Sequence, residues 1–347
     1  MRTFVYLGLV IFLVVGLSAQ RSNAACSGVM NGLGGQDINC PLPLQSTTLN
    51  IVSSPAFTTN FPDNVTIPNP GGIQVGSVFA IITEAGDDTL TVNGIVHSQT
   101  STAIFTSGGN DMVFVGPGAD ISGDFGVSTS NENDLIRVTG GMISATTLPI
   151  GSGFDDDTVE ITGGSISSMG PEILNTSAGN DTLRISGGTF GPGTIQTSSQ
   201  EDLIVVSGGI FAGNEIDAGL DVDTIHITDD IPNLGILNCG GGAGMDSLIL
   251  SMDVPQGQVA TLSAEFMAGG EFNEITVNGI TYEWAECENR IPNFNGVVTT
   301  ISLAPHTATN IIDDTHRVSA TVLTDGEPDP GVVVTFRIIS GPNQGTM

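Results

Sequence analysis

A five-residue pattern that returns at a nearly constant interval constrains this chain more than any other feature. Each copy is an aspartate followed by apolar residues at the second and fourth positions after it, as in Asp181-Thr-Leu183-Arg-Ile185. Successive copies start 21 to 24 residues apart, and a constant period in this range predicts a stacked array of repeats. The eight aspartates that open the copies are Asp88, Asp111, Asp134, Asp157, Asp181, Asp202, Asp223 and Asp246. A weaker copy over Asp63–Ile67 extends the array toward the N-terminus.

Each repeat contains three short segments that are typical of β-strands. The first is the pattern itself, whose alternation places its apolar side chains on one face. Glycine pairs such as Gly163-Gly164 follow it and permit a sharp corner. Two more apolar positions come next, occupied in successive repeats by Ile143, Ile166, Phe190 and Phe211, and then by Val127, Ile150, Ile195 and Ile216. We therefore expect an all-β chain whose residues 63–250 form a right-handed parallel β-helix, or β-solenoid, of about eight or nine coils.

The ends of such a solenoid need covering, because an open sheet edge pairs with other chains. Residues 25–62 are the predicted N-terminal cap and residues 251–300 the predicted C-terminal cap. Four cysteines fit disulfides in an exported protein. Proximity in the sequence favours Cys26–Cys40 and Cys239–Cys287, although four cysteines allow three pairings. A hairpin is also expected around Ile275–Trp284, with Trp284 filling the end of the core.

The N-terminus has the form of a secretory signal. Arg2 precedes an apolar run over Phe4–Leu17, and small residues end at Ala25. This run is shorter than the roughly 20 residues that a membrane-spanning helix requires. We expect residues 1–24 to be a signal peptide and the protein to be extracellular or at the cell surface. A lipoprotein acylated at Cys26 is the alternative.

The chain is strongly acidic, with 37 Asp and Glu against seven Lys and Arg and a net charge of −30. Such a surface repels nucleic acid and anionic lipid and attracts cations. We therefore expect no nucleic-acid partner. High acidity also favours solubility by itself, without any bound partner.

Two interpretations of the eight aspartates remain open. Stacked carboxylates repel each other, so the sequence requires something that compensates. In the first interpretation each aspartate accepts backbone N–H groups at the corner. In the second, the eight aspartates are candidate calcium ligands between adjacent coils. The segment Gly241–Leu248 resembles the calcium-binding nonapeptide of toxin-type repeats, but that family repeats every nine residues.

The position three residues after each aspartate should face outward. There Arg137, Glu160 and Arg184 occupy successive repeats, which predicts an exposed charge ladder or a patch that contacts carbohydrate. A polysaccharide lyase or glycosidase on a β-helix is the alternative function. Lys is absent and Trp284 is the single tryptophan, so the cationic and aromatic side chains that such enzymes use on acidic sugars are scarce. We expect no enzyme activity and no catalytic residue.

Residues 60–250 resemble the repeats of bacterial parallel β-helix exoproteins, including autotransporter passengers and filamentous adhesins. The tail resembles bacterial immunoglobulin-like domains of the invasin and intimin type. This second likeness rests on His316–Val322, the turn Asp325-Gly-Glu-Pro328, and Val332–Asn343. Such a sandwich needs roughly 100 residues, so residues 301–347 are expected to be the start of one.

Together these features predict a secreted or cell-surface structural and adhesive repeat protein. The resemblance implies that it carries tandem immunoglobulin-like modules downstream and binds a surface ligand, either protein or glycan.

Overall fold

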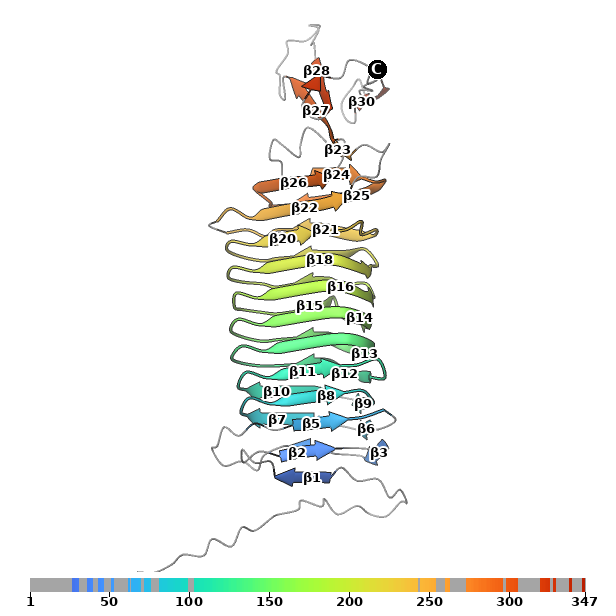
Figure 1. Cartoon of the computed structure of the whole chain (residues 1–347), viewed down its shortest axis with the longest axis vertical. Helices are drawn as coiled ribbons and strands as arrows, with labels where there is room; N and C mark the ends of the chain where they lie inside the picture. Colours follow the sequence, from blue (N-terminus) through green and yellow to red (C-terminus); the bar gives the residue numbers. More distant parts are fainter. Residues whose placement is uncertain are drawn as a thin grey trace, which may run out of the picture.

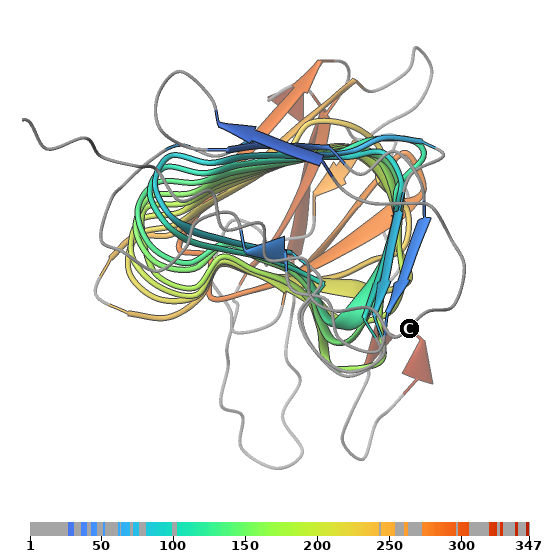
Figure 2. The same ribbon diagram turned by 90° about the horizontal axis from the view of Figure 1, so that it is seen from below.

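The computed structural model describes mainly residues 81–98, 103–253 except 243, and 273–295, with shorter strands before and after these ranges. Strands dominate this part of the chain, and none of its elements is a helix. Figure 1 shows the coils stacked into a column, and the end-on view in Figure 2 shows successive coils nearly superposed. The predicted all-β solenoid is therefore confirmed.

Three parallel sheets run along the column. The first contains the strands that follow the aspartates, each paired in register with the strand one coil away. Its members are β2 (Gln36–Asn39), β5 (Asn64–Ile67), β8 (Thr89–Val92), β11 (Met112–Val115), the starts of β13 (Leu135–Gly151), β14 (Thr158–Ser168), β16 (Thr182–Phe190) and β18 (Leu203–Ile210), then β20 (Thr224–Ile227), β22 (Ser247–Asp253) and β26 (Asn289–Asn295). Strand β5 confirms the weaker first copy, whose Asp63 lies outside the described residues.

The second and third sheets complete each coil. The second runs through β3 (Pro43–Ser46), β6 (Gly72–Val75), β9 (Ile95–Ser98), β12 (Asp120–Ser128) and the later parts of β13, β14, β16 and β18. The third runs through β4 (Ile51–Val52), β7 (Ile81–Ala85), β10 (Ile104–Gly108), the ends of β12 and β13, β15 (Glu172–Asn175), β17 (Thr194–Gln196), β19 (Asn214–Asp217), β21 (Leu234–Asn238) and β25 (Ile280–Ala285). These are the three strands per repeat that the sequence predicts.

Columns of apolar side chains fill the solenoid. The two inward residues of each aspartate strand, such as Leu183 and Ile185, are at most 1% exposed. The other two predicted columns are also buried, including Ile166 and Ile195. Burying aliphatic side chains of this size contributes roughly 1.5–3 kcal/mol each, and only stacking makes that burial complete.

The corner after each first strand depends on glycine. The second glycine of every predicted pair has a positive φ, for example +96° at Gly164. A side chain there would meet the backbone of the preceding coil: a Cβ at Gly164 would lie 2.9 Å from the Gly140 oxygen. The corner therefore needs glycine both for its backbone conformation and for close coil packing.

A hairpin covers the C-terminal end of the described column. Strand β24 (Asn273–Val277) pairs antiparallel with β25, which in turn extends the third sheet beside β21. Trp284 is 0% exposed and fills the end of the core as expected, and Tyr282, at 1% exposed, is buried there with it. The backbone N–H of Ile231 donates to the Tyr282 hydroxyl at 2.9 Å, which ties the hairpin to the loop before β21.

The remaining strands are short and lie near the two ends of the chain. Strand β1 (Ser27–Met30) pairs antiparallel with β2, and β23 (Ala260–Leu262) pairs with β24 and with β27 (Val298–Ala304). Beyond them lie β28 (Ser319–Thr324), β29 (Glu327–Pro328), β30 (Arg337–Ile338) and β31 (Gly345–Thr346), all in antiparallel pairs. An immunoglobulin-like sandwich in this region stays a prediction. The predicted signal peptide and the Cys26–Cys40 pair lie outside the described residues.

Candidate functional site: a buried aspartate spine

The eight aspartates stack in one column inside the solenoid, which we call the aspartate spine. Each lies directly before a strand of the first sheet, and each is at most 4% exposed. Strict alternation along the strand explains this burial, because an aspartate at position zero shares its face with the apolar residues at positions two and four. The outward-facing residues are the ones between them.

From Asp111 onward, one carboxylate oxygen of each spine residue accepts a hydrogen bond from the backbone of the neighbouring coil. The N–H of Asp111 donates to Oδ1 of Asp134 at 2.8 Å, and the N–H of Asp181 donates to Oδ1 of Asp202 at 2.7 Å. The same bond links every successive pair from Asp88 to Asp246, at 2.7–2.9 Å. These contacts confirm that the aspartates accept backbone N–H groups, with one difference from the prediction: the donor belongs to the preceding coil rather than to the residue's own corner.

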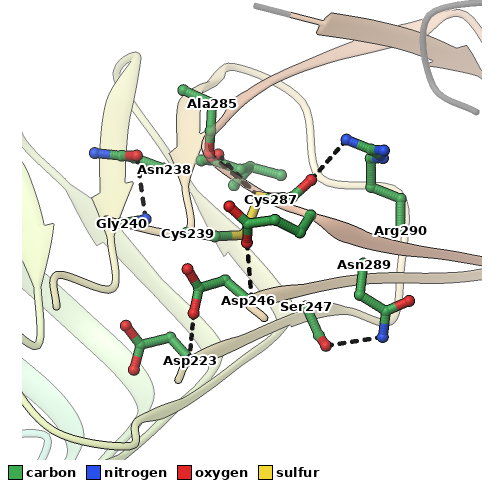
Figure 3. Close-up of a disulfide and its surroundings, with 12 residues drawn as sticks. Asp223, Asn238, Cys239, Gly240, Asp246, Ser247, Ala285, Cys287, Asn289 and Arg290 are labelled. Carbon is green, nitrogen blue, oxygen red and sulfur yellow. Dashed lines mark hydrogen bonds between the residues drawn. A yellow bond between two sulfur atoms is a disulfide. The ribbon is translucent and has the colours of Figure 1, made fainter. Parts of the chain in front are cut away.

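The chain of bonds continues into the C-terminal cap. The N–H of Asp246 donates to Oε2 of Glu288 at 3.0 Å, so a glutamate occupies the next place in the spine. Figure 3 shows Asp223 and Asp246 in this arrangement beside the disulfide. The sequence pattern gave no sign of Glu288, because no Asp-x-apolar-x-apolar copy begins there.

The second carboxylate oxygen is buried without a hydrogen bond of normal geometry. This holds for the Oδ2 atoms of Asp111, Asp134, Asp157, Asp181, Asp202 and Asp223. A hydroxyl lies against five of these carboxyls, close enough to act on their pKa, and comes from the residue five positions upstream. These neighbours are Thr106, Thr129, Ser152, Thr176 and Thr197. The constant offset of five between hydroxyl and aspartate is a signal that the sequence itself contains.

These hydroxyls form a column of their own. Thr129 donates to the Ser152 carbonyl, and Thr197 donates to the Ala218 carbonyl at 2.8 Å. Ser152 and Thr176 make the same bond to the next coil at 3.4 and 3.2 Å. The hydrogens of these four hydroxyls therefore point to backbone carbonyls, and their lone pairs are left for the adjacent carboxyl. Thr106 makes no such bond.

Burial raises the pKa of the spine carboxyls well above their ordinary value of 3.8. The pKa rises to about 8 at Asp134 and Asp202, to about 7 at Asp157 and Asp223, and to about 6 at Asp111. Desolvation is the largest cause, because an apolar surrounding disfavours the charged form. The backbone N–H bonds and the neighbouring hydroxyls oppose this rise, whereas neighbouring carboxylates add to it. The pKa of Asp181 rises to about 6, and that of Asp246 is also raised.

A second polar column runs along the outside of the same corner. It consists of the residues just before the spine: Asp87, Asn110, Asn133, Asp156, Asn180 and Glu201. Here the bonds run in the opposite direction, so that the N–H of Asn180 donates to Oδ1 of Asp156 at 2.8 Å in the preceding coil. The other members repeat this bond at 2.9–3.3 Å. The two columns together join each pair of coils at the corner from both sides.

The predicted outward charge ladder forms only in part. Arg137 Nε lies 2.6 Å from Glu160 Oε2, and the Arg137 guanidinium lies 5.8 Å from the centre of the Phe114 ring. Arg184 is opposite Glu160 in the strand register, but the described part of the chain shows no ion pair between them. Arg137 and Glu160 border a shallow open depression that also includes Asn133 and Asp156. The spine residues Asp111 and Asp134 line the same depression, although they are only 1% and 4% exposed.

The spine does not gather ligands around a point, which calcium would require. Calcium takes six to eight oxygen ligands, whereas the spine residues from Asp111 to Asp223 each commit one oxygen to an N–H and bury the other. Among the described residues no group of three or more His, Cys, Asp or Glu side chains is placed to hold a metal ion. These contacts assign the aspartates to backbone hydrogen bonding, and calcium binding stays a prediction.

The predicted clamp between Cys239 and Cys287 is present. Their Cα atoms lie 5.1 Å apart across a disulfide, and the two residues are 0% and 3% exposed. Cys239 directly follows β21, and Cys287 follows the capping hairpin. Figure 3 shows that the bond joins the final coils to the segment that covers them.

Comparison with known proteins gives this chain no relatives. No protein-family model, no curated protein and no solved structure matches it. None of the elements in the described part of the chain is a helix long and apolar enough to cross a membrane.

Proposed function

We propose that this chain is a secreted or cell-surface repeat protein whose solenoid acts as a rigid structural and adhesive rod, not as an enzyme. One observation carries the proposal. The carboxyls with strongly raised pKa, which in an accessible cleft would suggest acid–base catalysis, belong to residues that are at most 4% exposed and are bonded to the backbone of adjacent coils. These carboxyls hold adjacent coils together.

The outer surface supports the same function. The exposed polar side chains at the corner repeat from coil to coil and bond to neighbouring backbone, which produces a long and regular surface. Regular solenoids offer extended surfaces on which several weak contacts can be made at once. The ligand of such a rod would be a protein or a glycan on another surface. Tandem immunoglobulin-like modules downstream would hold the rod away from its point of attachment.

Carbohydrate turnover is the second candidate function, and the shallow depression beside Arg137 favours it. An arginine beside Glu160 and the exposed Asp156 is a combination that could bind a sugar and transfer protons. The depression is open, however, and Arg137 is already engaged by Glu160 and Phe114. We therefore place this activity second.

Binding and turnover assays on the whole chain separate the two functions. The chain is immobilised on beads and tested for saturable binding to cell surfaces and to glycan arrays, while acidic and neutral polysaccharides are incubated with it and their new reducing ends are counted. The rod predicts saturable binding and no new reducing ends. Turnover that Arg137→Ala abolishes, and that the matched exposed variant Arg184→Ala retains, would establish the enzyme instead.

A further inference from the structure

The interior of the solenoid contains a mismatch of hydrogen-bonding groups that a proton would remove. Next to Asp134, Asp157, Asp181 and Asp202 the neighbouring hydroxyl hydrogen is committed to a backbone carbonyl. The carboxylate oxygen Oδ2 is also a buried acceptor. The single hydroxyl hydrogen can serve either the carboxylate or the backbone carbonyl, so one of these two acceptors is left without a donor while the carboxylate is ionised. A buried acceptor without a donor costs about 1–3 kcal/mol. Protonation turns Oδ2 into a donor and satisfies both groups.

We propose that the aspartate spine holds protons at neutral pH, foremost on Asp134 and Asp202, so that the solenoid is most stable in mild acid and loses stability as the pH rises. The bound proton neutralises a carboxylate and so relieves the repulsion between stacked carboxylates. It needs no space between coils and leaves the Oδ1 bond to the adjacent N–H intact.

The charged surroundings of the spine favour the protonated form. Among the described residues, every charged side chain that acts on these carboxyls is itself acidic. Outside the spine these groups are Asp87, Glu132, Asp155, Asp156, Asp217, Asp221, Glu286 and Glu288. Within the spine each carboxyl also faces its neighbours, as Asp202 faces Asp181 and Asp223. No cation offsets these effects in the described surroundings, so removing one proton makes removal of the next harder.

The direction of the pH effect follows from proton linkage. The folded chain holds these protons up to a pH between about 6 and 8, whereas an unfolded aspartate releases its proton near 3.8. Between these limits the folded state binds more protons than the unfolded state, and stability therefore falls as the pH rises. Below the pKa of the unfolded aspartate both states are protonated, and the stabilisation is fully present. Above the pKa of the folded carboxyls both states are ionised, the stabilisation is lost, and stability no longer changes with pH.

Surface charge produces a change in the same direction and has to be separated from this effect. The net charge of −30 disfavours the compact state at alkaline pH, but salt screens that repulsion. Buried carboxyls are screened much less. The decisive comparison is therefore between one buried and one exposed aspartate at fixed ionic strength.

The test replaces Asp202 by asparagine in the full chain. Asparagine keeps an oxygen for the Asp181 N–H and places an amide donor toward the Thr197 lone pair, so it imitates the protonated acid. We expect Asp202→Asn to raise the melting temperature by about 5 °C near pH 8.5 and to leave it unchanged near pH 5. The matched control is Asp156→Asn, which removes one exposed carboxylate and should cause a smaller shift that high salt suppresses.

An infrared measurement on the unaltered chain tests the proposal without any variant. A protonated carboxyl has a carbonyl band separate from that of a carboxylate, and this band should persist at pH 7 and disappear as the solution is made alkaline. A melting temperature that is lower for Asp202→Asn at both pH values, together with no acid band at pH 7, would overturn the proposal. Melting that calcium raises and a chelator lowers, with only carboxylate bands present, would overturn it in favour of a metal.

Discussion

Removing the Cys239–Cys287 disulfide should loosen the C-terminal end of the solenoid and leave its middle unchanged. The bond closes a loop of 48 residues, and the loss of loop entropy in the unfolded chain makes such a crosslink worth about 4 kcal/mol. Each coil contacts mainly its neighbours, so the effect should remain local. The double variant Cys239→Ala/Cys287→Ala is the perturbation.

The single tryptophan of the chain provides a local assay. Trp284 is fully buried, lies three residues before Cys287 and pairs with Leu237 in the third sheet. Its fluorescence reports unfolding of the cap, whereas far-ultraviolet circular dichroism reports the whole column. With a urea dependence of about 2 kcal/mol per molar, the tryptophan midpoint should fall by about 2 M while most of the dichroism transition stays in place.

Reduction of the unaltered chain is the control for this experiment. It breaks the same bond without removing the two sulfur atoms from the core, so it separates the crosslink from the loss of packing. A tryptophan midpoint that does not move, although thiol titration shows both cysteines to be reduced, would refute the reasoning. A shift of equal size in both signals would show that the column unfolds as a single unit.

Two further substitutions test the packing between coils. Gly219→Ala should lower the free energy of unfolding by about 3 kcal/mol or more in a urea titration, because φ is +105° there and a Cβ would lie 2.1 Å from the Ser198 carbonyl oxygen. Gly213→Ala should lower it by only about 1 kcal/mol, because φ is +79° there but no atom lies within 4 Å of the added Cβ. Equal losses would show that strain rather than coil contact decides the effect. Thr197→Val should lower the free energy of unfolding by about 1–3 kcal/mol, because it leaves the Ala218 carbonyl without its donor. An unchanged urea midpoint would show that the hydroxyl column does not stabilise the solenoid.

The sequence by itself determined the architecture of the column. Period-two alternation after each aspartate specifies a strand and its buried face, and the constant interval specifies how the strands stack, so residues such as Leu183 and Ile166 could be placed in the core correctly. The glycine pairs identified the corners, and the positions of the cysteines in the sequence favoured the Cys239–Cys287 disulfide that the structure contains. These features are local or periodic, and they depend on the chain alone.

Only the tertiary structure decided what the polar residues do. Whether Asp134 meets an N–H, a cation or water depends on the coil stacked against it, and no spacing in the sequence gives the direction of that bond. The N–H of Asp111 in the preceding coil reaches it, and the Thr129 hydroxyl is placed against it with its hydrogen already committed. Likewise Arg137 pairs with Glu160 while Arg184 shows no such bond, although all three share one register. Hydrogen bonds and ion pairs require particular side-chain directions across coils, and those directions exist only once the coils are stacked.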